Sequence, residues 1–207
     1  MRILASLFTL LVISSVSAQN ILVADNNPNA PTGPHVYNTL QAAVDAATPG
    51  DIIHVIPSST SYDGTTDIFI TQNDISIYGI GFFPQKDGPQ VATVDAFQIS
   101  ANNVRISGLK ITNNVYFGHV LGSYSGITIE NSEIRNINSN TSGSLTYSNI
   151  LVRGCILNRD GGDATPALDF SDRINQSVVS NTIIVGYRAN TTTNYDDVVA
   201  RNGTIFK

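Results

Sequence analysis

The chain has 207 residues, of which 42% are hydrophobic and only 13% are charged. This composition excludes a disordered polyelectrolyte and fits one globular domain. The formal net charge of −5, without a basic stripe, argues against a nucleic-acid partner. Because Cys155 is the only cysteine, an intramolecular disulfide and a cysteine metal cluster are also excluded.

Residues 1–18, MRILASLFTLLVISSVSA, have the features of a signal peptide. Arg2 supplies the positive start, a mostly apolar run follows, and Ala18 places a small residue before the expected cleavage point. The apolar run is short for a bilayer span. We therefore expect a secreted or cell-surface protein whose mature part, residues 19–207, is a single domain outside the membrane. Without Arg2 it has 10 basic and 16 acidic residues, a net charge of −6.

The segment YNTLQAAVDAATPGD, residues 37–51, predicts a short helix. Asn38 or Thr39 can cap its start and Pro49-Gly50 stops it. The apolar residues at helical spacing are Leu40, Ala43, Val44 and Ala47. DIIHVIPS, residues 51–58, then predicts a strand. A helix laid over this first strand layer would cover an otherwise open sheet edge.

An eleven-residue pattern is then repeated along the chain. NVRISGLKITN (103–113) is followed by GITIENSEIRN (126–136), NILVRGCILNR (149–159) and the looser QSVVSNTIIVG (176–186). One column of the repeat contains only Gly and Asn, at intervals of about 21 to 29 residues, a period typical of a solenoid. The residues of this column are Gly79, Gly108, Asn131, Gly154, Asn181 and Asn202.

Gly and Asn are the residues that accept a left-handed backbone most readily, so the column predicts a tight corner between two short strands. Apolar residues alternate on both sides of each corner, which predicts parallel strands stacked about 4.8 Å apart around a shared core. The side chains expected to be buried there are Val104, Ile106, Leu109, Ile111, Ile127, Ile129, Ile134, Ile150, Val152, Leu157, Val179 and Ile184. Cys155 also falls on an inward position, as a small buried side chain rather than a nucleophile.

Charged residues on the outward positions should meet between adjacent copies of the repeat. The alignment places Glu130 beside Arg153 and Lys110 beside Glu133. We interpret these as surface ion pairs that help to fix the register, each contributing about 0–1 kcal/mol.

The segment TLQAAVDAATPGDIIHVIPSSTSYDG (39–64), followed by copies of NVRISGLKITN, resembles the right-handed parallel β-helix superfamily, the pectin-lyase-like fold. The resemblance covers residues 36–207 and implies an all-β fold: a right-handed parallel β-helix (solenoid) with a short N-terminal capping helix. VVARNGTIFK (198–207) stops inside a copy of the repeat. We therefore expect the N-terminal portion of a longer, exported bacterial-type β-helix protein, with downstream coils or a further domain.

The same resemblance implies a polysaccharide as partner, because the superfamily includes pectate lyases and polygalacturonases. Its lyases hold Ca²⁺ with carboxylates and its hydrolases use clustered Asp residues. Ca²⁺ is therefore the candidate cofactor. The candidate acidic or metal-binding residues lie in two long late loops: Asp160, Asp163, Asp196 and Asp197. Tyr187 and Tyr195 are candidates for stacking on sugar rings. No catalytic residue is assigned, because the Gly-His-Gly and Arg-x-Lys motifs of polygalacturonases are absent.

Two functions remain open. The first is binding of an extracellular polysaccharide in a pectate-lyase-like manner, with cleavage by a polysaccharide lyase or glycoside hydrolase if the protein is an enzyme. The alternative is a non-catalytic structural or adhesive segment of a larger cell-surface protein. A net charge of −6 repels a polyuronate unless a cation or a basic groove intervenes.

Overall fold

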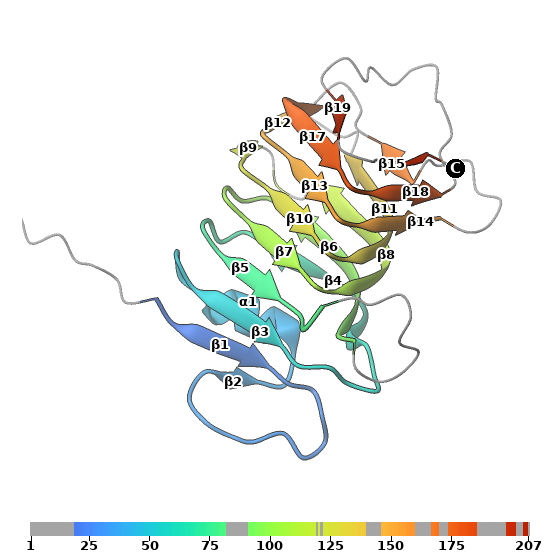
Figure 1. Ribbon diagram of the computed structural model, residues 1–207. Helices are drawn as coiled ribbons and strands as arrows, with labels where there is room; N and C mark the ends of the chain where they lie inside the picture. Colours follow the sequence, from blue (N-terminus) through green and yellow to red (C-terminus); the bar gives the residue numbers. More distant parts are fainter. Residues whose placement is uncertain are drawn as a thin grey trace, which may run out of the picture.

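The computed structural model describes residues 19–81, 91–118, 120, 122–139, 146–159, 167–169, 174–185, 198–201 and 205–206. Within these ranges the protein is all-β with one α-helix, and its strands form three parallel sheets that we name A, B and C. Figure 1 shows the strands as successive layers, rising from β1 near one end to β17 and β18 near the other.

Sheet A has nine strands and contains the first strand of each repeat. In spatial order they are β2 (Val36–Tyr37), β1 (Ile21–Ala24), β3 (Ile52–Val55), β5 (Ser76–Tyr78), β7 (Arg105–Ser107), β10 (Thr128–Glu130), β13 (Leu151–Arg153), β17 (Ser177–Ser180) and β19 (Val198–Arg201).

Sheet B contains the second strand of each repeat, and sheet C is shorter. The strands of sheet B are β4 (Tyr62–Ile70), β6 (Thr93–Ile99), β8 (Lys110–Phe117), β11 (Glu133–Ser139), β14 (Ile156–Asn158), β18 (Ile183–Val185) and β20 (Ile205–Phe206), with β15 (Leu168–Asp169) paired to β11. Sheet C consists of β9 (Ser123–Ser125), β12 (Thr146–Ser148) and β16 (Ile174–Asn175). From β7 to β12 the chain therefore visits sheets A, B and C in turn, twice.

The core consists of inward side chains stacked on their equivalents in the next layer. In sheet A, Ile106 is in register with Ile129, and Ile129 with Val152. Each of the twelve residues predicted to be buried is at most 1% exposed, which confirms the predicted alternation. Cys155 is buried as expected. One layer cannot cover its own inward side chains, so this burial exists only because the layers stack in register.

The predicted corners lie between sheets A and B. Gly108, Asn131, Gly154 and Asn181 have φ values of 73°, 50°, 62° and 49°, the left-handed conformation expected from their identities. Gly79 lacks a positive φ but needs glycine for another reason: a Cβ there would collide with the carbonyl oxygen of Gly108. Asn202 lies outside the described residues.

A second series of corners, which we did not predict, lies at the start of the sheet A strands. Each residue of the predicted column from Gly79 to Asn181 has a member of this second series five residues before it in the chain. Backbone hydrogen bonds join successive members to neighbouring layers, for example from Asp74 N to Asn102 O at 2.9 Å and from Asn103 N to Ser125 O at 2.8 Å. The residues with positive φ are Gly50, Asp74, Asn103, Gly126, Asn149 and Gln176.

The helix α1 (Leu40–Ala46) begins at Thr39, whose side-chain oxygen accepts a hydrogen bond from Ala42 N at 3.1 Å. Its buried residues, Leu40, Ala43 and Val44, are among those expected from the spacing. Gln41 bonds to the outermost strand of sheet B: its Nε2 donates to Phe69 O at 3.2 Å and its Oε1 accepts from Phe69 N at 2.8 Å. The helix thus satisfies backbone groups at an open sheet edge, as expected.

We expect Ile129→Ala to lower the free energy of unfolding by about 2–5 kcal/mol, because it opens a cavity between two stacked neighbours. Urea unfolding followed by circular dichroism measures this loss. Thr128→Ala, on the same strand but with a partly exposed side chain, is the matched control and should change stability by less than about 1 kcal/mol. Equal effects of the two substitutions would contradict the assigned register.

Asn131→Val should destabilise the protein, whereas Asn131→Gly should be tolerated. The φ of 50° at this corner is unfavourable for a β-branched side chain and acceptable for glycine. Thermal unfolding of the two variants provides the comparison. If valine and glycine gave the same midpoint, the left-handed corner would not be what the position requires.

Candidate functional site

The six site residues predicted from the late loops lie outside the described residues: Asp160, Asp163, Tyr187, Tyr195, Asp196 and Asp197. In chain order, the first two follow β14 and the other four follow β18, so both groups come after a strand of sheet B. Within the part of the chain that the structure describes, no three His, Cys, Asp or Glu residues are placed to hold a metal ion. A binding site must therefore be sought first on the described faces.

Sheet C has a hollow of about 290 Å³ on its surface. The register pairs Ser123 with Thr146 and Ser125 with Ser148, and the Thr146 hydroxyl donates to Ser123 Oγ at 2.7 Å. The six residues that line the hollow are Ser123, Tyr124 and Ser125 of β9 and Thr146, Tyr147 and Ser148 of β12.

Two tyrosines in the lining of this hollow pack against each other. The rings of Tyr124 and Tyr147 lie 5.5 Å apart at 36°. Tyr147 is buried, its hydroxyl donates to Ile99 O at 2.8 Å, and burial raises its pKa. The hollow therefore presents serine and threonine hydroxyls and the partly exposed Tyr124, which packs on buried Tyr147, with no charged residue in its lining. Such a surface can exchange hydrogen bonds with the hydroxyl groups of a sugar.

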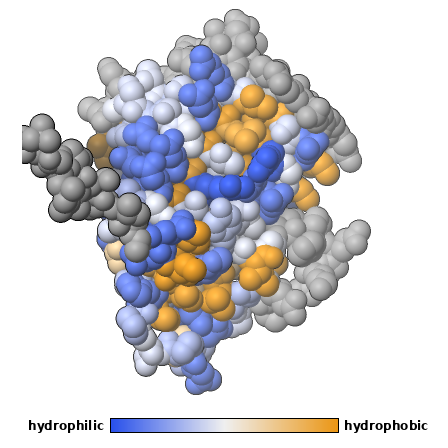
Figure 2. All heavy atoms as spheres, turned by 60° about the vertical axis from the view of Figure 1, so that its left-hand side comes forward, coloured by the Kyte–Doolittle hydropathy of each residue, from blue (hydrophilic) through white to orange (hydrophobic). Residues whose placement is uncertain are grey.

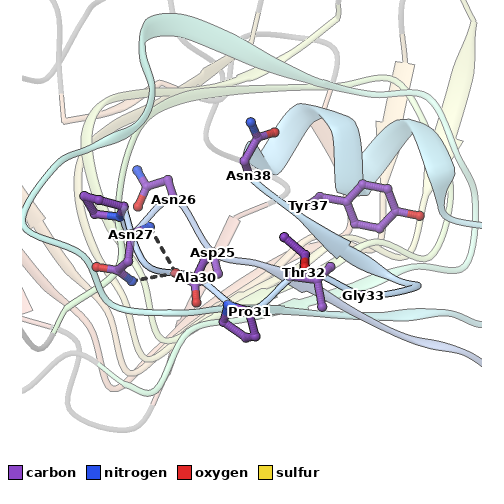
Figure 3. A pocket seen from close by; sticks show the side chains of 11 residues that line it. Asp25, Asn26, Asn27, Ala30, Pro31, Thr32, Gly33, Tyr37 and Asn38 are labelled. Carbon is purple, nitrogen blue, oxygen red and sulfur yellow. Dashed lines mark hydrogen bonds between the residues drawn. The ribbon is translucent and has the colours of Figure 1, made fainter.

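A larger cleft, of about 660 Å³, lies near β1 and β2 and is lined by eleven residues between Asp25 and Asn38. Figure 3 shows the polar side chains of Asp25, Asn26 and Asn38 around it. Asp25 Oδ1 accepts hydrogen bonds from Asn27 N at 3.1 Å and Asn27 Nδ2 at 2.5 Å. Asn26 Nδ2 donates to Thr60 O and Ser61 O. These bonds fix the fold of the loop itself, so we assign them a structural role.

A third arrangement, the arginine strip, lies on the outer face of sheet A and consists of His54, Tyr78, Arg105, Glu130 and Arg153. Glu130 is at its centre. Arg105 Nε donates to Glu130 Oε1 at 2.7 Å, and the Arg105 Nη2 group pairs with the same oxygen. Arg153 Nε and Nη2 contact Glu130 Oε2 at 2.6 and 2.5 Å.

The arginine strip corrects one expectation. The predicted pair of Glu130 and Arg153 is present, but Glu130 is only 3% exposed, so it is a buried carboxylate rather than half of a surface pair. Burial would raise the pKa of Glu130, but hydrogen bonds from both guanidinium groups outweigh burial and lower that pKa. The predicted pair of Lys110 and Glu133 is also present, at 3.6 Å.

Arg105 was missed because it does not stand opposite Glu130. It is in register with Thr128, two residues before Glu130, and its side chain reaches the carboxylate diagonally, from β7 to the neighbouring strand β10. Its guanidinium also lies 5.8 Å from the ring centre of Tyr78. The ring of Tyr78 is in turn 6.1 Å from that of His54. The strip is therefore continuous across β3, β5, β7, β10 and β13.

Cys155 takes no part in any of these arrangements. It lies in the core, and burial raises the pKa of its thiol to about 12. At that value the thiolate required of a nucleophile is scarce at neutral pH. This agrees with its predicted role as a small buried side chain.

Comparisons with known proteins give a similarity to a solved structure but no match in sequence. No protein-family model matches the sequence, and no curated protein matches it. A crystal structure of an alginate lyase from Paenibacillus sp. str. FPU-7 is similar with a TM-score of 0.48 and 17% sequence identity, over 81% of this chain and 72% of that chain. Among the described residues, no helix is both long and apolar enough to span a bilayer.

We expect Glu130→Gln to flatten the loss of stability at acid pH. Because the pKa of Glu130 is lowered on folding, its ionised form stabilises the native state above the ordinary value of 4.5. That contribution disappears as the pH falls through the lowered pKa. Chemical unfolding at several values between pH 7 and pH 2 should show wild type and variant converging as the solution becomes more acidic.

Glu133→Gln is the matched control for this titration. It removes a more exposed carboxylate, 21% exposed, which has one lysine partner at 3.6 Å. Surface pairs of this kind contribute little to stability. A constant difference between wild type and Glu130→Gln across the whole pH range would contradict the coupling of Glu130 ionisation to folding.

Proposed function

We propose that this chain is the exported domain of a polysaccharide-binding protein with a right-handed, pectin-lyase-like parallel β-helix. Residues 1–18 are proposed as its signal peptide and residues 19–207 as one domain. Three described features support the solenoid: all strand pairs are parallel, the repeats visit the three sheets in turn, and a helix covers one end. The right hand follows the general rule for parallel crossover connections.

The hollow of sheet C is the observation on which the proposed function rests. It presents hydroxyl groups and the partly exposed Tyr124, which packs on buried Tyr147, without a charged lining residue. A sugar ring has an apolar face that can contact Tyr124 and hydroxyl groups for the serine and threonine side chains. Because β9 and β12 carry the same pattern in register, neighbouring sugar units of one chain can bind in succession.

We propose binding, rather than cleavage, as the activity of this hollow. Cleavage of a glycosidic bond by a lyase or hydrolase requires a general acid or base. The titratable side chains in the lining are Tyr124 and Tyr147, and their hydroxyls donate to the carbonyl oxygens of Val120 and Ile99. The proposed source of such groups, or of ligands for Ca²⁺, is the set Asp160, Asp163, Asp196 and Asp197. The second candidate function, a structural or adhesive segment of a larger cell-surface protein, is favoured by the uncharged lining of the hollow.

Isothermal calorimetry of the mature chain with a panel of neutral and acidic polysaccharides tests this proposal, with and without Ca²⁺. The double variant Ser123→Ala and Thr146→Val should weaken binding by about fivefold to 150-fold, since each lost hydrogen bond contributes about 0.5–1.5 kcal/mol. Thr112→Val, which removes an exposed threonine hydroxyl from sheet B, is the matched control and should bind as wild type.

The same samples separate the alternatives. New reducing ends, or the ultraviolet absorbance of an unsaturated product, would show cleavage by a hydrolase or a lyase. Absence of heat and of product with every polysaccharide would contradict polysaccharide binding and favour the structural segment. Unchanged affinity of the double variant, with intact folding, would place the binding surface outside sheet C.

A further inference from the structure

We propose that the outer face of sheet A is a second binding surface, specific for an anionic polysaccharide whose chain lies along the stacking direction. Its carboxylate or sulfate groups would contact Arg105 and Arg153. This inference rests on the proposed function only in taking a polysaccharide as the ligand. The surface itself is separate from the uncharged hollow of sheet C. Figure 2, turned toward the left side of Figure 1, shows strongly hydrophilic side chains between hydrophobic groups.

The two arginines have hydrogen-bond donors to spare. A guanidinium has five N–H donors, and in both residues only Nε and Nη2 contact Glu130. The side chains of Arg105 and Arg153 are 42% and 49% exposed. The remaining donors therefore have solvent access, and a planar fork of this kind suits carboxylate and sulfate groups.

Glu130 holds these donors in place. Because it is buried and bonded to both guanidinium groups, it restricts two long side chains that would otherwise be mobile. It neutralises only one of the two positive charges, so the group of three keeps a net charge of +1. The ligand would thus meet an oriented, positively charged surface.

The two arginines stand on alternate strands of sheet A. Arg105 on β7 and Arg153 on β13 are separated by β10, which carries Glu130. With about 4.8 Å between neighbouring strands, β7 and β13 are about 9.6 Å apart. The small residues Ser107 and Ser180 stand beside Glu130 and Arg153 in the same column and leave the guanidinium groups prominent. An extended polymer with anionic groups along its length can contact both arginines.

The rest of this face does not cancel the positive charge. Two outward columns run along the strands from β3 to β17. The first contains His54, Tyr78, Ser107, Glu130, Arg153 and Ser180, and the second contains Ile52, Ser76, Arg105, Thr128, Leu151 and Val178. Glu130 is the one carboxylate among them. On sheet B, by contrast, the outward carboxylates Asp67, Asp95 and Glu133 outnumber the outward cations Lys110 and Arg135.

Binding measurements with four probes test the surface: polygalacturonate, dextran sulfate, neutral dextran and single-stranded DNA. Polygalacturonate or dextran sulfate should bind, and binding should weaken when salt is raised from 50 to 300 mM. Arg105→Gln and Arg153→Gln should each weaken it about tenfold, the usual scale for one charge-assisted contact. Lys110→Gln is the control, since Lys110 is 43% exposed and equally charged but lies on sheet B.

Glu130→Gln distinguishes a binding surface from a purely structural ion pair. Removing the internal counter-charge raises the local charge from +1 to +2, so anion binding should become several-fold tighter even if the melting temperature falls. A structural cluster with no ligand would show only the lower melting temperature. Should that variant not fold, Arg105→Lys replaces it: it keeps the charge but loses the fork, and its affinity should lie between those of wild type and Arg105→Gln.

The outcomes separate this inference from the proposed function. Binding of neutral dextran alone, unaffected by the arginine substitutions, would overturn the anionic surface and leave polysaccharide binding at sheet C intact. Binding of DNA as tightly as of both acidic polysaccharides would overturn the ligand class. No binding of any probe would overturn both proposals. Loss of acidic-polymer binding in both arginine variants, with Lys110→Gln unchanged, would support the surface.

Discussion

In-register stacking of parallel strands is the constraint on which the rest of this structure depends. A single layer of three short strands cannot bury its inward side chains, so Ile129 is protected only by Ile106 below it and Val152 above it. Every corner must therefore turn the chain identically, which explains the left-handed residues on both sides of the sheet A strands. At the first strand of sheet B, the side chain of Gln41 in α1 forms the hydrogen bonds to the Phe69 backbone that a neighbouring strand would otherwise form.

The same register determines which outward side chains meet. Glu130 and Arg153 are 23 residues apart in the sequence and directly adjacent in space. Repetition alone would give a ladder of identical contacts, but substitutions between the copies differentiate the faces. Sheet A acquires arginines around one buried carboxylate, whereas β9 and β12 of sheet C carry only hydroxyl and aromatic side chains. A uniform core and distinct faces are compatible because inward and outward positions alternate independently along each strand.

Periodicity was sufficient to predict the core, the predicted corners from Gly108 to Asn181 and the capping helix, since each has a strong local signal. The second series of corners escaped prediction because its members include Asp, Asn, Gly and Gln, and only the constant five-residue offset connects them. The burial of Glu130 was also missed. Strand parity correctly places it outward, but parity takes no account of Arg105 reaching over it from a neighbouring column. The hollow of sheet C had no signal beyond two short polar strands.

A scaffold of this kind suits a polymer better than a small ligand. Its layers repeat about every 4.8 Å, so any favourable contact made on one strand recurs at a fixed interval along the stack. A chain of sugar units can use several of these contacts at once, and each additional contact then acts at a high effective concentration. The described faces can therefore bind a polymer and align it with the stacking direction. Cleavage of a single bond would need catalytic groups that do not repeat along the stack. The segments between sheets vary most in length and sequence between copies of the repeat, so such groups can be introduced there without disturbing the stacked core.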